Sequence, residues 1–120
     1  MSSNKKILNI GLDIGSTTVK IVAMDSRGNI LYKDYRRHFS NTKKTITDLL
    51  NELLKSHNNM NYTISMTGSG AISLAKYLKV NFVQEVIACK NAIEEYAPQT
   101  SVAIELGGED AKIIYFKAVL

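Results

Sequence analysis

Short apolar runs open the chain, and each is followed by a polar turn. Residues 7–12, 19–24 and 30–39 are rich in branched or aromatic side chains, as strands are. The turns between them carry Gly15 and Gly28, where glycine allows a tight reversal of the chain. The pattern therefore predicts three consecutive strands joined as a meander.

Apolar positions then change to a helical period. A stripe at i, i+3, i+4, i+7 and i+8 predicts a helix with Asn41 or Thr42 as its N-terminal cap, and the helix ends at His57-Asn58-Asn59. The stripe consists of Ile46, Leu49, Leu50, Leu53 and Leu54. The segments after it are a strand at 61–67, a helix at 71–78, a short strand at 80–83, a helix at 84–96 and strands at 102–106 and 111–116.

This order, β-β-β-α-β-α-(β)-α-β-β, indicates an α/β fold of the ribonuclease-H-like class. A meander followed by alternating helices and strands gives a mixed sheet with helices covering it. We expect residues 1–100 to form a first subdomain and residues 101–120 to begin the next strand pair. Because the sequence stops within an expected strand region, we expect it to be the N-terminal part of a longer protein.

Composition excludes several classes of protein. The 120 residues are 45% hydrophobic and 22% charged, which is globular rather than disordered composition. The net charge of +4 comes from cations spread along the chain, so we expect neither a nucleic-acid nor a membrane partner. A single cysteine and no signal peptide favour a cytoplasmic location.

Two strand–turn–strand segments share one design, ILNIGLDIGSTTVKIVAMD and SVAIELGGEDAKIIYF. Each has a carboxylate near the end of an apolar strand, glycine in the turn, and then a lysine, Lys20 or Lys112. Glycine lets backbone amides approach an anion, and the hydroxyls after Gly15 can donate to phosphate oxygens. Asp13 can hold Mg²⁺ through water. Either segment alone can be an ordinary hairpin, but two matched segments favour a phosphate clamp.

These segments resemble the phosphate loops of the actin, sugar-kinase and heat-shock ATPase superfamily. Within it, the sequence is similar to the BadF/BadG/BcrA/BcrD-type ATPases, the activators of 2-hydroxyacyl-CoA dehydratases and benzoyl-CoA reductases. The resemblance spans most of residues 7–117 and rests on GLDIGSTTVK, MTGSG, FVQEVIA and AIELGGEDAKII in that order. It implies that residues 1–100 belong to an actin-like ATPase domain.

The resemblance also implies a function for the intact protein. It would be a homodimeric ATPase that binds ATP and Mg²⁺ and carries a [4Fe–4S] cluster, whose ligands lie outside this chain. Hydrolysis would drive a low-potential electron to an acyl-CoA dehydratase or reductase partner. Residues 1–120 alone are expected to be inactive.

Site residues follow from matching the family's motifs to this sequence. Asp13 and Glu105 would be catalytic, with Asp13 also associated with Mg²⁺ through water. Glu105 stands where short activators have aspartate, and Ala71 where they often have arginine. The expected phosphate-binding residues are Gly15, Ser16, Thr17, Thr18, Lys20, Gly107, Gly108, Glu109, Asp110 and Lys112.

Three other residues with reactive side chains are expected to have ordinary roles. Cys89 should pack on one side of helix 84–96, together with Val86, Ile93 and Tyr96. His38 and His57 have polar neighbours in the sequence and are expected to be solvated.

Three alternative functions stay open. One is a sugar or acetate kinase of the same superfamily, and another is an actin-like scaffold switched by nucleotide. A third is a ribonuclease-H-like nuclease with Asp13 as the first metal ligand. The nuclease would need further carboxylates at the same place, and Asp25 and Asp34 are the candidates in the meander.

Overall fold

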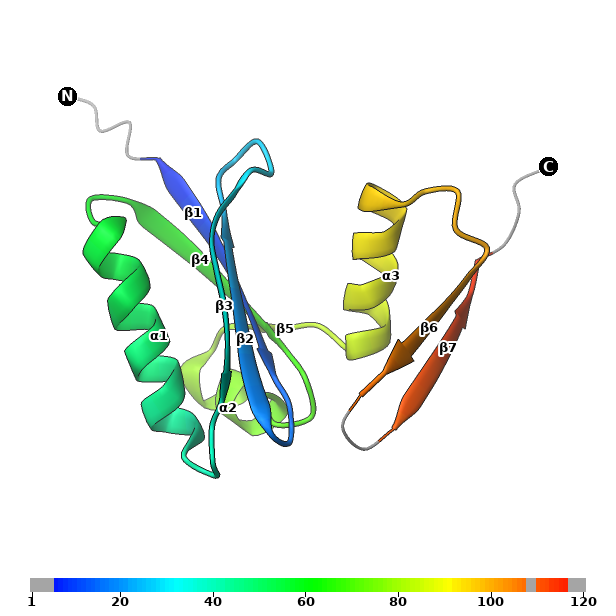
Figure 1. Cartoon of the computed structure of the whole chain (residues 1–120). Helices are drawn as coiled ribbons and strands as arrows, with labels where there is room; N and C mark the ends of the chain where they lie inside the picture. The colour runs from blue at the N-terminus through cyan, green and yellow to red at the C-terminus, as the bar shows by residue number, and fades with distance from the viewer. Residues whose placement is uncertain (1–5, 108–109, 117–120) are drawn as a thin grey trace. The chain divides into compact units, whose positions relative to one another are not determined.

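The computed structural model describes residues 6–107 and 110–116 and has every element in the predicted order (Figure 1). Observed bounds differ from the predicted ones by at most two residues. The strands are β1 Ile7–Ile14, β2 Thr18–Met24, β3 Ile30–Arg37, β4 Asn61–Thr67, β5 Asn81–Phe82, β6 Val102–Leu106 and β7 Ala111–Tyr115. The helices are α1 Thr42–Ser56, α2 Ile72–Leu78 and α3 Glu85–Tyr96.

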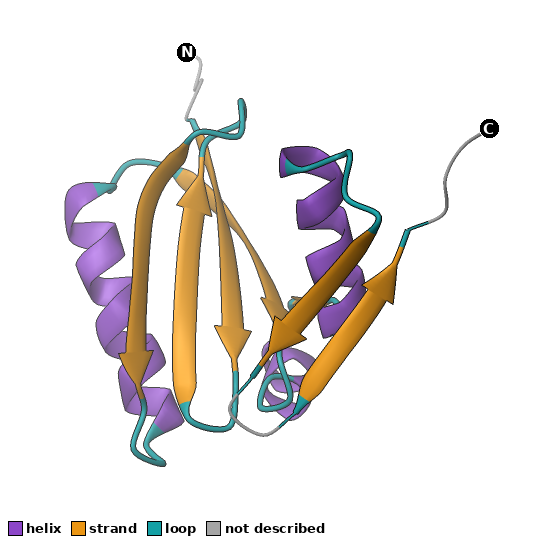
Figure 2. Cartoon of the chain, turned by 45° about the vertical axis from the view of Figure 1, so that its right-hand side comes forward, coloured by secondary structure: helices purple, strands orange, loops and turns teal. Residues whose placement is uncertain are grey.

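Five strands form a mixed sheet in the order β3-β2-β1-β4-β5 (Figure 2). β1 pairs antiparallel with β2, and β2 pairs antiparallel with β3, which confirms the meander. β4 adds to the other side of β1 in parallel, and β5 follows in parallel. This mixture of directions confirms the predicted α/β fold.

One apolar core lies between the sheet and helices α1 and α2. Alternate residues of β1, from Leu8 to Ile14, are buried, and so are the matching residues of β2. α1 contributes Ile46, Leu49 and Leu53 to the same core, as its stripe predicts. The Asn41 side chain accepts a hydrogen bond from the Lys44 amide and caps α1, which confirms one of the two candidate caps.

The contacts divide the chain into two units, Met1–Phe82 and Val83–Leu120. The second unit contains α3 and the antiparallel β6–β7 hairpin. The expectation that residues 1–100 form one subdomain stays a prediction. Among the described residues, no helix has the length and apolar character needed to span a membrane.

The predicted packed face of α3 is wrong in part. No residue of α3 is buried, and both Val86 and Tyr96 are exposed, whereas Cys89 and Ile93 are half-buried. Among the described residues of its unit, the β6–β7 hairpin is the only strand pair beside α3, and two strands are too narrow to cover a whole helix face. Ile114 of β7 is buried, so it is the hairpin residue that packs most fully.

Candidate functional site: two glycine turns with paired acid and lysine

The turn between β1 and β2 is a tight hairpin. β1 ends at Ile14 and β2 begins at Thr18, and the Gly15 amide donates to the Thr18 carbonyl at 2.9 Å. Ser16 and Thr17, which form the tip, are exposed. The segment therefore forms a hairpin, and the hydroxyls of Ser16 and Thr17 at its tip are accessible to a ligand.

The carboxylate and the lysine of this hairpin face each other. Asp13 and Lys20 are cross-strand partners, with 3.7 Å between Oδ2 and Nζ. Their side chains are 39% and 52% exposed, so the ion pair is weak and both groups can exchange partners. The Lys20 amine also lies 5.8 Å from the centre of the Tyr35 ring. The pair can therefore open to admit a phosphate or a hydrated cation.

The loop after β4 packs directly against the end of β1. Gly70 donates its amide to the Ile14 carbonyl at 2.9 Å, and Gly68 has a φ of +103°. A Cβ on Gly68 would overlap the Ile14 carbonyl and lie 2.7 Å from Oδ1 of Asp13. The MTGSG segment thus has glycine where a side chain would displace Asp13 and the first turn.

This arrangement fits a hydrated magnesium ion. β1 and β4 run in parallel with Asp13 opposite Thr67, and the carboxyl ends of such strands are where α/β folds bind ligands. Thr67 Oγ1 is buried and has no hydrogen-bond partner among the described residues. Asp13 would hold the ion through water, as Mg²⁺ commonly requires. In residues 6–107 and 110–116, no three His, Cys, Asp or Glu side chains group as metal ligands.

The β6–β7 hairpin repeats the first hairpin in register. Gly107 donates its amide to the Asp110 carbonyl at 2.8 Å, three residues on, as Gly15 does to Thr18. Glu105 lies opposite Lys112, as Asp13 lies opposite Lys20. Gly108 and Glu109, predicted to complete this second turn, lie outside the described residues. The two segments that look alike in the sequence therefore form hairpins with the same strand register and the same hydrogen bond across the turn.

Lys112 is held more firmly than Lys20. Its amine lies 2.9 Å from Glu85 Oε2 and 3.2 Å from Asp110 Oδ2, with the side chain only 23% exposed. Hydrogen bonds to Glu85 and then to Asp110 raise the pKa of Lys112. Glu85, the first residue of α3, is the one member of this cluster that the sequence analysis did not assign, although it lies within the FVQEVIA motif.

Cys89 of α3 lies near Glu105 and Lys112 of the hairpin. Burial raises the pKa of its thiol, and the charge and hydrogen bonding of Glu105 raise it further. It is the only cysteine of the chain, and an iron–sulfur cluster needs several thiolates. The residues of this chain therefore do not fit a [4Fe–4S] cluster.

His38 corrects the prediction that both histidines are solvated. It is 8% exposed, and its Nε2 lies 3.0 Å from the Gly15 carbonyl oxygen. His57 is half-buried at the end of α1, with Nδ1 3.3 Å from the Leu53 carbonyl. His38 is thus a contact of the first turn, and the sequence analysis did not include it in the site.

The two carboxylates considered for a nuclease are used elsewhere. Asp25 accepts hydrogen bonds from the Asn29 side chain at 3.0 Å and from the backbone of its own turn. These bonds lower the pKa of Asp25, and the bond from the Asn29 side chain contributes most. Asp34 pairs with Arg36 at 2.8 Å. Neither carboxylate is a neighbour of Asp13 in the sheet register.

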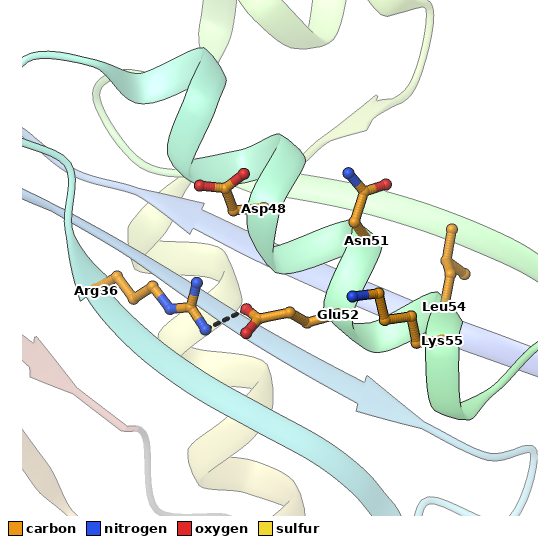
Figure 3. Close-up of a pocket in the computed structure, with 6 residues that line it drawn as sticks. All are labelled: Arg36, Asp48, Asn51, Glu52, Leu54 and Lys55. Atoms are coloured by element: carbon orange, nitrogen blue, oxygen red, sulfur yellow. Dashed lines mark hydrogen bonds and ion pairs between the residues drawn. The ribbon is translucent and has the colours of Figure 1, made fainter.

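A separate surface groove lies between α1 and β3 (Figure 3). Arg36 forms an ion pair across it with Glu52. The groove is lined by Arg36, Asp48, Asn51, Glu52, Leu54 and Lys55. None of these residues was predicted for the phosphate site.

A family model and several solved structures resemble this chain. Residues 10–112 match the family model DEDD_Tnp_IS110, described as a transposase. No curated protein matches significantly. Component A of (R)-2-hydroxyglutaryl-CoA dehydratase from Acidaminococcus fermentans superposes with a TM-score of 0.77 at 21% identity, over 92% of this chain and 43% of that one.

Two further structures show the same fold. The activator of 2-hydroxyisocaproyl-CoA dehydratase from Clostridium difficile, with bound ADPNP, gives a TM-score of 0.74 at 21% identity, over 92% of this chain and 41% of that one. A Ppx/GppA family member from Aquifex aeolicus gives a TM-score of 0.57 at 14% identity, over 93% of this chain and 48% of that one. The chain therefore has the ribonuclease-H-like, actin-like α/β fold of these structures, and it spans less than half of their length.

Proposed function

The chain belongs to the IS110-type DEDD transposase family, and we propose that its β1–β2 turn binds the phosphates of a magnesium–nucleotide complex. The observation that carries the proposal is the repeated hairpin, in which a carboxylate faces a lysine beside a glycine turn in the same register. Glycine turns expose backbone amides to anions, and the lysine adds positive charge. Each hairpin of this kind suits a phosphate group.

Each predicted residue has a role in this proposal. Asp13 would hold the ion through water, and Ser16, Thr17 and Thr18 would donate hydroxyl hydrogens to phosphate oxygens. Gly15 would form the turn itself, and Gly68 would let the loop after β4 lie against the end of β1. In the second hairpin, the residues that we propose for phosphate binding in the intact protein are Gly107, Gly108, Glu109, Asp110 and Lys112.

The reaction we propose for the intact protein is ATP hydrolysis. A water oxygen would bond to the γ-phosphorus, the bond from that phosphorus to the β–γ bridging oxygen would break, and ADP, phosphate and a proton would leave. Asp13 would act through the hydrated ion, and Glu105 is the second carboxylate that we propose as catalytic in the intact protein.

The finer proposal is an activator role, supported by the likeness to two dehydratase activators, one with bound ADPNP. In that role the intact protein would be a homodimer whose ATP hydrolysis drives electron transfer to an acyl-CoA dehydratase or benzoyl-CoA reductase type of partner. A cluster for that transfer would have to lie outside this chain, since Cys89 is its only cysteine.

A second candidate is metal-dependent DNA strand cleavage, favoured by the family match. It too would use Asp13, as a metal ligand.

Assays of ATP hydrolysis and of DNA nicking by the intact protein separate the candidates, and Asp13→Ala tests the residue that both require. Asp48→Asn is the control, because Asp48 pairs with Lys44 on the surface of α1. We expect the wild type and the control to release phosphate from ATP, and Asp13→Ala to release none while still folding. Wild-type turnover in Asp13→Ala would refute the proposal. Magnesium-dependent nicking of plasmid DNA without nucleotide, lost in Asp13→Ala, would establish the second candidate instead.

A further inference from the structure

His38 joins two turns that are distant in the sequence. It directly follows β3, and its Nε2 lies 3.0 Å from the Gly15 carbonyl oxygen, while its Nδ1 lies 3.0 Å from the Ser40 amide. Its own amide donates to the Thr17 carbonyl at 3.0 Å. The tip of the first turn is therefore contacted by both the ring and the backbone of one buried residue.

The two ring contacts agree on one tautomer. A backbone amide can only donate, so the Ser40 contact requires an unprotonated Nδ1, and the neutral ring then carries its hydrogen on Nε2. A carbonyl oxygen can only accept, so Nε2 donates to Gly15. His38 is thus a fixed donor aimed at the Gly15 peptide.

The position of the ring is itself fixed. Phe39 and Ser40 both have positive φ, 47° and 63°, which residues with side chains seldom adopt. This conformation brings the Ser40 amide back onto Nδ1. The His38 carbonyl accepts from the amide of Asn41, the cap of α1, at 2.7 Å. The histidine is therefore anchored to the start of α1.

The Gly15 contact determines which way the next amide points. The chain has no cis peptide among its described residues, and in a trans peptide the carbonyl and the following N–H point in opposite directions. Since the Gly15 carbonyl faces His38, the Ser16 amide points away from it. Other carbonyls of the turn are also engaged, Ile14 with Gly70 and Thr17 with His38.

We infer that His38 is a positioning residue of the phosphate-binding turn, which holds the Gly15 peptide so that the Ser16 amide is presented to an anion. This inference rests on the proposed nucleotide-binding function. His38 does not itself touch the phosphate, because both ring nitrogens are occupied by backbone groups.

Two substitutions separate the ring contacts. In His38→Gln the amide nitrogen can take the place of Nε2 and keep the bond to Gly15. In His38→Asn the amide oxygen can take the place of Nδ1 and keep the bond to Ser40, but the side chain is too short to reach Gly15. Calorimetric titration of the intact protein with MgADPNP should show an affinity about tenfold weaker for His38→Asn and close to wild type for His38→Gln.

Amide hydrogen exchange of residues 14–18 without nucleotide is the second readout. Exchange there should be faster in His38→Asn than in His38→Gln. Equal exchange and equal affinity in the two variants would overturn the inference. If the wild type bound no MgADPNP, the phosphate-binding function would fail and the phosphate part of the inference with it, while exchange would still decide whether His38 holds the turn.

Discussion

Gly68 lies against Ile14 so closely that no side chain fits between the loop after β4 and the end of β1. A Cβ at position 68 would overlap the Ile14 carbonyl oxygen, and its φ of +103° disfavours any residue other than glycine. The parallel pairing of β1 and β4 brings the two segments together. The first turn and Asp13 therefore depend on a glycine 51 to 55 residues away in the sequence.

Gly68→Ala should destabilise the protein by about 3 kcal/mol, because the substitution combines a steric overlap with an unfavourable backbone conformation. Denaturant unfolding of the intact protein measures the loss. Gly11→Ala is the matched control, since a Cβ there meets nothing within 4 Å and φ is not positive. Equal stability of the two variants would show that the loop does not pack on β1 in this way.

Cys89 should react slowly with iodoacetamide at pH 8, because burial and then Glu105 raise the pKa of its thiol. Glu105→Gln removes the negative charge, which lowers the thiol pKa and should increase the alkylation rate about two- to fivefold. Glu95→Gln removes a charge from an exposed residue of the same helix and should leave the rate unchanged. A rate that does not respond to Glu105→Gln would place Cys89 away from Glu105.

Asp25 makes stability depend on pH in the acid range. Hydrogen bonds from Asn29 lower its pKa from the ordinary 3.8, so the folded state binds its proton less readily than the unfolded state. Its contribution is present above about pH 4 and is lost as the pH falls through the folded value. The Tm difference between wild type and Asp25→Asn should therefore shrink below about pH 4. A difference that stays constant down to pH 2 would contradict this.

Patterns local to one element were enough to predict most of the fold. The α1 stripe, the Asn41 cap and the two glycine hairpins each depend on neighbours within a few residues, and all are confirmed. The predicted packed face of α3 was wrong in part, because burial of a helix face depends on the elements that pack against it and not on the helix sequence alone. Val86 and Tyr96 have helical spacing but remain exposed.

The missed contact of His38 has a similar cause. Its sequence neighbours Arg36 and Arg37 indicate a solvated site, yet His38 continues the alternation of the partly buried Tyr32 and Asp34 along β3. The sequence did not show this period, because two of the partly buried positions carry the charged residues Asp34 and Arg36. The contact of His38 with Gly15 was not predictable, since it depends on the β2–β3 register and on two positive φ angles after the strand.

Hydrogen exchange of the intact protein, with and without MgADPNP, tests nucleotide binding at the first turn most directly. We predict protection of residues 14–18 and of the adjoining loop at 68–70. The turn at 25–29 lies at the opposite end of β2 and should be unchanged, which makes it an internal control. No protection of residues 14–18 at saturating nucleotide, or protection confined to other segments, would contradict the account.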